Sequence, residues 1–214
     1  MSQLILASSS PRRKEILSML GLEFATIPAD IDESIKENEQ PESYVLRLAK
    51  EKALKVAIDY SDAIVIGSDL TIDLAGKTFG KAQNPEMAKQ FLENYSGKSH
   101  YTHCGFAIVI NNKVISSGVA NTTITFKDLT AEEITNYVSD KEWLGLAGSY
   151  GVQGTAAKFI TKFQGSYFDI LGLPIYEIAG VLIKLGMKFE LSKLDEMRKM
   201  DSEKCRGLNG LRSN

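Results

Sequence analysis

The segment Ser8-Ser9-Ser10-Pro11-Arg12-Arg13 places three hydroxyls and two guanidiniums side by side. It follows the apolar residues 4–7, which have the length of a short strand. Ser10 and Pro11 are residue types favoured at the N-cap and the first position of a helix. Free N–H groups at a helix N-terminus attract anions, and arginine forks match phosphate oxygens. The segment therefore predicts a phosphate site, and the alternative is an ordinary serine cap followed by two solvated arginines.

Asp69 follows a second apolar stretch, residues 63–67, whose β-branched centre is typical of a buried parallel strand. Active sites of α/β sheets gather at the carboxyl ends of strands, so a carboxylate here suits base catalysis or metal binding. The alternative is that Asp69 is a turn residue. If the strand continues, Asp69, Thr71 and Asp73 share one face of it. We expect Asp73 to be solvated.

A third group of candidates is the acidic loop that contains Asp30, Asp32 and Glu33. Carboxylate oxygens are ligands that Mg²⁺ accepts while it keeps several waters, so the loop is suited to a divalent cation that bridges phosphates. Acidic loops also occur simply as solvated surface. Both alternatives stay open at this point.

Two other motifs do not predict a site. Ala75-Gly76-Lys77-Thr78 ends like a phosphate-binding loop, but Thr71 stands where that motif requires its first glycine. His100 and His103 are three residues apart in an expected strand, so their side chains point to opposite faces and form a poor metal pair.

Helices and strands that alternate along the chain must position these residues. We expect an α/β protein with mixed strand direction, in which residues 1–187 form a single domain and residues 188–214 a charged C-terminal helix or tail. Helices are expected at about 11–20, from 41 through 56, and at 85–95, 130–139 and 174–186. Strands are expected at about 4–7, 24–28, 63–67, 101–110 and 114–126, with turns at Gly76 and Asn111-Asn112-Lys113.

Composition excludes several classes of protein. The net charge of −2 and the lack of a basic stripe argue against a nucleic-acid partner. No apolar run approaches the roughly 20 residues of a membrane span. The two cysteines, Cys104 and Cys205, lack metal-binding spacing, which favours a reducing cytoplasm.

Taken together, these segments resemble the Maf family of nucleoside triphosphate pyrophosphatases. The resemblance covers about residues 3–180, and the ordered set of segments is more specific than any one of them. The segments are Leu-Ile-Leu-Ala-Ser-Ser-Ser-Pro-Arg-Arg (4–13), Asp32-Glu33, Tyr-Val-Leu-Arg-Leu-Ala-Lys-Glu-Lys-Ala (44–53), Ile-Gly-Ser-Asp (66–69), Gly80-Lys81, Ala-Gly-Ser-Tyr-Gly-Val-Gln-Gly (147–154), Gly-Ser-Tyr (165–167) and Gly-Leu-Pro (172–174).

The resemblance implies a mixed, twisted sheet flanked by helices, with two lobes around a central cleft, similar to inosine triphosphate pyrophosphatases. It also implies a divalent metal, Mg²⁺ or Mn²⁺, held by Glu33 and Asp69. Asp69 is the implied general base. The implied triphosphate cradle consists of Ser8, Arg13, Lys52 and Lys81, with Glu33 as a metal-supporting carboxylate.

Three positions separate the substrate branches of the family, and here they hold Arg12, Leu70 and Gln153. The dTTP/UTP branch carries Arg, Thr and Gln at these places, whereas the 7-methyl-GTP branch carries Trp, Gln and Glu. The chain departs from the dTTP/UTP branch at Leu70. It also departs from the family at Glu142-Trp143-Leu144-Gly145, where Glu-Pro and an acidic residue are usual, and we expect that change to concern local packing.

The resemblance thus predicts hydrolysis of a nucleoside triphosphate, of the dTTP or UTP kind, to the monophosphate and pyrophosphate. One alternative substrate class is modified or non-standard nucleotides, such as 7-methyl-GTP, ITP or XTP. Another class of function is a non-catalytic nucleotide- or nucleic-acid-binding regulator of cell division. The sequence leaves a homodimer open.

Overall fold

The computed structural model describes residues 3–210, and its centre is one mixed sheet of seven strands. The sheet order is β2-β1-β3-β5-β6-β7, and β4 pairs with the end of β3. β1 runs parallel to β2 and β3, whereas the other neighbours are antiparallel. The strands are β1 (Leu4–Leu6), β2 (Ala25–Thr26), β3 (Ile64–Leu74), β4 (Lys77–Phe79), β5 (Ser99–Ile110), β6 (Lys113–Phe126) and β7 (Ile160–Gln164).

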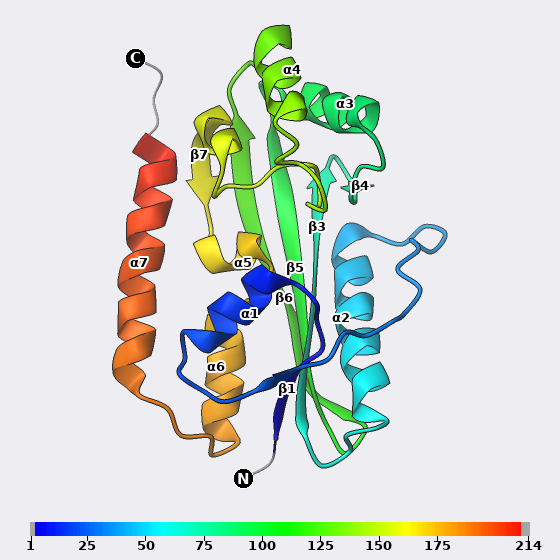
Figure 1. Cartoon of the computed structure of the whole chain (residues 1–214), viewed down its shortest axis with the longest axis vertical. Helices are drawn as coiled ribbons and strands as arrows, with labels where there is room; N and C mark the ends of the chain where they lie inside the picture. The colour runs from blue at the N-terminus through cyan, green and yellow to red at the C-terminus, as the bar shows by residue number, and fades with distance from the viewer. Residues whose placement is uncertain (1–2, 211–214) are drawn as a thin grey trace.

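Helices flank both faces of this sheet, which confirms the predicted fold class (Figure 1). α2 covers one face, α1 and α6 cover the other, and α3 packs against α4 at one end of the molecule. The helices are α1 (Pro11–Ser18), α2 (Pro41–Ala57), α3 (Pro85–Tyr95), α4 (Ala131–Ser139), α5 (Tyr167–Leu171), α6 (Ile175–Lys184) and α7 (Leu191–Gly210), with a 3-10 turn, η1 (Thr155–Phe159).

The central parallel strands are apolar throughout because both of their faces are buried. Ile5 and Val65 pack with the alanines of α2, whereas Leu6 and Ile66 pack with α1 and α6. All four side chains are fully buried. A strand with two covered faces shows no alternation of apolar and polar residues. The continuous apolar stretch 63–67 predicted such a buried strand.

β3 continues past Gly67 to Leu74, so Asp69 lies within the strand and not in a turn. Asp73 corrects an expectation, because its side chain is only 14% exposed and its Oδ2 lies 3.1 Å from His103 Nε2. Asp73 also accepts a hydrogen bond from Gly76 N in the turn to β4. It belongs to a structural contact between β3 and β5 and is not a solvated residue.

Residues beyond the predicted domain form α7, which packs along β7 and α5. Asn209 bonds both the N–H and the carbonyl of Phe163 on the edge strand β7, at 2.8 and 3.0 Å. Asp201 accepts a hydrogen bond from Tyr167 N at the start of α5. Among residues 3–210, no helix has the length and apolar character needed to cross a membrane.

Candidate active site

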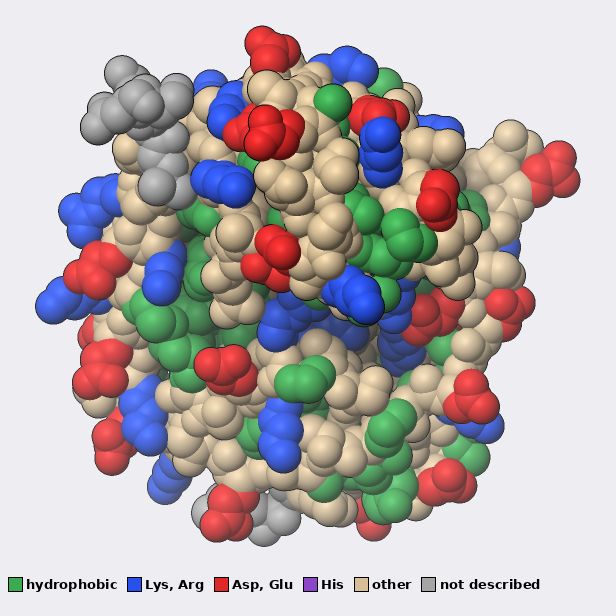
Figure 2. Space-filling view, turned by 45° about the horizontal axis from the view of Figure 1, so that its top comes forward, with side chains coloured by type: hydrophobic (Ala, Val, Ile, Leu, Met, Phe, Trp, Pro, Cys, Tyr) green, Lys and Arg blue, Asp and Glu red, His purple; other side chains and the backbone are tan. Residues whose placement is uncertain are grey.

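A cavity of about 730 Å³ opens between the start of α1, the middle of β3, α2 and the loop before residue 148. This volume lies in the range of small-molecule sites. Figure 2 shows Lys and Arg side chains gathered in a hollow of the surface. The polar and charged residues that line the cavity include Ser8, Ser9, Ser10, Arg12, Arg13, Glu33, Lys52, Asp69, Thr71 and Lys81.

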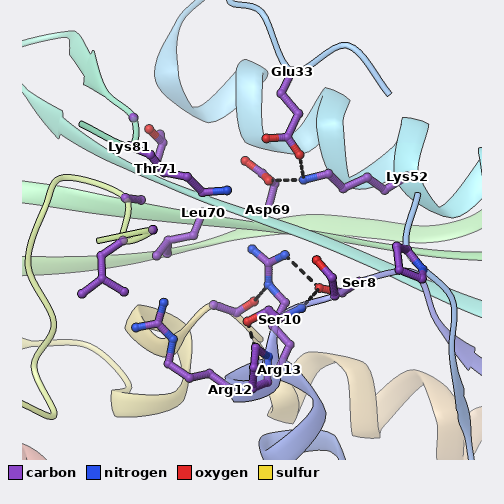
Figure 3. A pocket seen from close by; sticks show the side chains of 18 of the residues that line it. Ser8, Ser10, Arg12, Arg13, Glu33, Lys52, Asp69, Leu70, Thr71 and Lys81 are labelled. Atoms are coloured by element: carbon purple, nitrogen blue, oxygen red, sulfur yellow. Dashed lines mark hydrogen bonds and ion pairs between the residues drawn. The ribbon is translucent and has the colours of Figure 1, made fainter. Parts of the chain in front are cut away.

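Lys52 bridges two carboxylates at the floor of this cavity (Figure 3). Its Nζ lies 2.5 Å from Asp69 Oδ1 and 2.6 Å from Glu33 Oε1. Lys52 and Asp69 are buried, whereas the Glu33 side chain is 45% exposed. A buried ammonium between two carboxylates keeps each charge partnered.

Two glycines allow α2 to bring Lys52 to this position. A Cβ on Gly67 would lie 2.1 Å from the carbonyl oxygen of Ala49, and a Cβ on Gly105 would lie 2.4 Å from that of Val45. Both helix residues belong to α2, so its backbone rests directly on β3 and β5. Any larger residue at either glycine would push α2 away from the sheet and Lys52 away from Asp69.

The start of α1 forms a second part of the site. Ser8 Oγ accepts hydrogen bonds from Ser10 N, at 3.1 Å, and from Arg13 Nη1, at 3.3 Å. Ser10 caps the helix by accepting from Arg13 N, and Pro11 occupies the first turn, as predicted. The helix N-terminus and the Arg13 guanidinium therefore face the cavity together, in an arrangement suited to a phosphate.

The backbone carbonyl of Gly172 holds this arginine in place, and sequence reasoning did not single it out. Arg13 Nε donates to Gly172 O at 2.8 Å, and Ser68 Oγ lies 2.8 Å from the same oxygen. Gly172 ends α5 with a φ of +104°, a conformation that favours glycine. The sequence signals at this position are a glycine after a short helix and the segment Gly-Leu-Pro (172–174) of the family resemblance, and neither specifies a contact with Arg13.

The proposed selectivity residues are not all at the cavity. Arg12 and Leu70 line it, as does Lys81 of the cradle. Gln153 is exposed and is not among the lining residues. The cavity lining therefore includes every site residue that the family resemblance implied except Gln153.

Only one member of the acidic loop reaches the site. Glu33 lines the cavity, whereas Asp30 does not. Asp32 accepts hydrogen bonds from Ser34 N and Ser34 Oγ, both at 2.9 Å, in a local turn. Those hydrogen bonds lower the pKa of Asp32. The loop thus contributes a single carboxylate, and Asp32 has a local structural role.

The segment 142–145 corrects the expectation that its change concerns only packing. Trp143 does pack, with its Nε1 donating to Val138 O at 2.9 Å and its ring in the core. However, Leu144 and Gly145 line the cavity, as do the next two residues, Leu146 and Ala147. The departure from the family pattern therefore alters the wall of the site.

The electrostatics of the cavity favour a polyanion. Its lining contains four cationic side chains, Arg12, Arg13, Lys52 and Lys81, against the carboxylates of Glu33 and Asp69. Burial lowers the pKa of Arg12, and the adjacent charge of Arg13 lowers it further. Such a cluster lowers its electrostatic energy when an anion enters.

The positive surroundings favour the ionised form of Glu33. Burial opposes the charge on Glu33, but the hydrogen bond and charge of Lys52, with the charges of Lys81 and Arg13, hold its pKa below the ordinary value. Burial and the negative charges of Asp69 and Glu33 raise the pKa of Tyr44 to about 12. Tyr44 therefore stays neutral, and its hydroxyl donates to Glu33 O at 2.9 Å.

The donor set fits a metal that shares its ligands with a substrate. Residues 3–210 contain no group of three or more His, Cys, Asp or Glu side chains arranged to hold an ion. Glu33 and Asp69 supply carboxylate oxygens on the same cavity wall. Mg²⁺ is commonly bound by one or two carboxylates together with phosphates and water, so these residues suit that mode.

Comparison with known proteins agrees with the resemblance seen in the sequence. The family model for Maf-like proteins matches residues 3–185. A dTTP/UTP pyrophosphatase from Syntrophus aciditrophicus (strain SB) is 40% identical over 185 residues, which are 86% of this chain and 90% of that protein. A dTTP/UTP pyrophosphatase from Bacillus cereus (strain AH820) is 42% identical over 175 residues, 82% of this chain and 91% of that protein.

Among solved structures, a HAM1 protein from Coxiella burnetii aligns with 57% of this chain and 71% of its own. Its TM-score of 0.39 and its sequence identity of 19% are too low to carry an argument. The family match instead spans the whole sheet and every residue that lines the cavity. This chain therefore belongs to the Maf family.

Proposed function

We propose that this protein hydrolyses a nucleoside triphosphate, of the dTTP or UTP kind, to the monophosphate and pyrophosphate. The observation that carries the proposal is a buried carboxylate, Asp69, on the wall of a cavity with four cationic side chains. The names of the two relatives, both dTTP/UTP pyrophosphatases, support the same reaction and substrate class.

In the proposed reaction, a water oxygen forms a bond to the α-phosphorus. The bond from that phosphorus to the oxygen bridging it to the β-phosphorus breaks, and pyrophosphate leaves with the electron pair. The proton of the attacking water passes to Asp69. Its Oδ1 is paired with Lys52, which leaves Oδ2 to accept a hydrogen bond from the water. A general base of this kind contributes about 10²–10⁴-fold to the rate.

The cations of the cavity act on the phosphates. Arg13, held between Ser8 Oγ and Gly172 O, presents its guanidinium at the start of α1. Lys81 and Lys52 lie on opposite sides of Asp69 (Figure 3). Fixed positive groups that face developing negative charge stabilise a transition state without reorganisation.

Lys52 has a further task in this mechanism, because its ammonium holds both carboxylates in place. Glu33 and Asp69 would hold a divalent cation, Mg²⁺ or Mn²⁺, that would neutralise triphosphate charge.

We place this activity in the cytoplasm, and the two free thiols, Cys104 and Cys205, are compatible with a reducing compartment.

The test is pyrophosphate release from a panel of dTTP, UTP, CTP, 7-methyl-GTP and ITP, each with Mg²⁺, with Mn²⁺ and with EDTA. We expect release from dTTP and UTP that depends on the metal. Release from 7-methyl-GTP or ITP alone would move the protein to the modified-nucleotide class. Salt-dependent DNA binding without turnover of any nucleotide would instead indicate a regulator.

A further inference from the structure

One wall of the cavity is aliphatic, in contrast to the charged floor. Leu70 of β3 lines the cavity, as do Leu144 and Leu146 of the loop between α4 and η1; we call these three residues the leucine lip. Leu144 is 56% exposed, although transfer of a leucine side chain out of water is favourable. An exposed leucine on a cavity wall offers a contact that an apolar part of a ligand can bury.

The loop that carries the lip is fixed to the rest of the site. Ala147 forms a β-bridge with Lys81, and Gly148 N donates to Gly80 O at 2.8 Å. Gly145 adopts a φ of +71°, which turns the chain between the two leucines. The lip is therefore anchored beside Lys81 of the cradle.

The lip also lies next to Arg12. A Cβ built on Gly151 would lie 3.0 Å from Leu146 Cδ1 and 4.0 Å from Arg12 Nη1. The side chains of Leu146 and Arg12 thus both lie near the backbone of Gly151. Arg12 supplies hydrogen-bond donors there, and Leu146 supplies only carbon.

We propose that the leucine lip contacts the C5–C6 edge of a pyrimidine base and favours bases with a methyl group on C5. This inference rests on the proposed function, because it takes the triphosphate to lie on the cationic floor. With the phosphates there, the base is left the part of the cavity where the leucines lie, with Arg12 and Lys81 at its border. The three leucines of the lip supply aliphatic side chains to the lining of the cavity.

The choice of edge follows from the chemistry of the bases. Leucine forms no hydrogen bonds, so a polar group pressed against the lip would lose its water without a replacement. The opposite edge of a pyrimidine has carbonyl or amino groups, and a purine presents N7. The C5–C6 edge bears only carbon-bound hydrogen or, in thymine, a methyl group, so it alone matches the lip.

The size of the effect follows from burial of one methyl group. Burying a CH₂-sized group is worth about 0.8 kcal/mol, which corresponds to roughly a fourfold preference. We therefore expect kcat/KM for dTTP to exceed that for dUTP about fourfold, because these substrates differ only in the methyl group. The pair 5-methyl-UTP and UTP should give a similar ratio and isolates the effect from the 2′-hydroxyl.

The decisive variant is Leu144→Ser, which changes an exposed side chain. We expect the dTTP/dUTP ratio to fall from about four to near one. The matched control is Leu191→Ser, since Leu191 is 63% exposed but lies at the start of α7, outside the cavity. This control should keep the wild-type ratio.

Binding measurements on Asp69→Asn separate the two proposals. Dissociation constants of dTTP and dUTP for this variant, alone and combined with Leu144→Ser, report the lip without turnover. A preference for dTTP that Leu144→Ser removes supports the lip even if wild type releases no pyrophosphate. Hydrolysis of both nucleotides with equal kcat/KM, or a ratio that Leu144→Ser leaves unchanged, would overturn the lip and leave the proposed activity standing.

Discussion

The two ends of the cavity are built in different ways. At the charged floor, Lys52, Asp69 and Arg13 come from regular elements and are fixed by hydrogen bonds of 2.5–3.3 Å. At the leucine lip, two of the three residues come from a loop, and Leu144 is more than half exposed. The floor therefore has little freedom to vary, whereas the lip can change without loss of the fold.

This difference suggests that chemistry and selectivity are separated in the molecule. A substitution at the floor removes a partner of a buried charge, which is costly. A substitution at the lip changes contact area worth a fraction of that. We therefore expect large effects on rate from the floor and small effects on substrate ratios from the lip.

The largest expected effect is that of Asp69→Asn. The amide is nearly the same size but cannot take the proton of the attacking water, so kcat should fall about 10²–10⁴-fold while nucleotide binding persists. Asp73→Asn is the matched control, because Asp73 lies on the same strand but outside the lining of the cavity. Steady-state pyrophosphate release measures both variants. Activity of Asp69→Asn within tenfold of wild type would exclude the base role.

The next largest effect is expected for Glu33→Gln. If Glu33 helps to hold a divalent cation, its loss should raise the metal concentration needed for half-maximal activity by roughly 10–100-fold. Asp32→Asn serves as the control, since Asp32 bonds only Ser34 in its own turn. Titration of Mg²⁺ and Mn²⁺ into EDTA-treated protein gives the measurement. Full activity of both the EDTA-treated protein and Glu33→Gln would refute the metal proposal.

A buried carboxyl group lies three residues before the glycine that holds Arg13. Asp169 lies on α5, which ends at Gly172, the residue that holds Arg13. Burial, and then the charges of Glu177 and Asp201, raises the pKa of Asp169 to about 8. The folded state therefore favours the protonated carboxyl. The contribution of Asp169 to the stability of the fold is complete below the ordinary pKa near 4, and it is lost as the pH rises through the raised pKa of about 8.

Asp169→Asn removes this dependence, because an amide does not ionise. We expect the variant to exceed wild type in melting temperature by at least about 2–4 °C at pH 9, the shift that 1 kcal/mol gives in a chain of this length. The advantage should shrink towards pH 5. Asp195→Asn on the exposed side of α7 is the control, since the Asp195 side chain is 73% exposed. If the melting temperatures of variant and wild type differed by the same amount at pH 5 and at pH 9, a buried, protonated Asp169 would be contradicted.

Local sequence signals predicted the parts of the site that depend on neighbouring residues. The cap of α1 by Ser10 and Pro11 follows from residue type, and Asp69 follows from the apolar strand before it. The contact of Lys52 with Asp69 spans 17 residues and depends on α2 resting against Gly67 and Gly105. No local pattern specifies that approach, and only the family resemblance indicated Lys52.

The lip was harder to foresee for a related reason. Leu144 and Leu146 belong to no helix or strand, and their direction depends on the left-handed conformation of Gly145 and on the bridge from Ala147 to Lys81. Gln153 was indicated only by its position in the family, and it lies outside the cavity lining here. Position in a motif predicts where the backbone lies better than where a loop side chain points.

The smallest expected effect, and the finest test of the lip, is Leu70→Thr. Leu70 is part-buried on the cavity wall, so threonine would exchange aliphatic contact for a hydroxyl that donates or accepts a hydrogen bond. Such a bond is worth roughly 1 kcal/mol, or about a fivefold change in kcat/KM. We expect Leu70→Thr to sharpen discrimination among dTTP, UTP and CTP, because a base carbonyl and a base amino group differ in what they offer the hydroxyl. It should also lower the preference for dTTP over dUTP, since one leucine of the lip is lost. Unchanged ratios together with a lower melting temperature would show that Leu70 only packs against the core, and the lip would then consist of Leu144 and Leu146 alone.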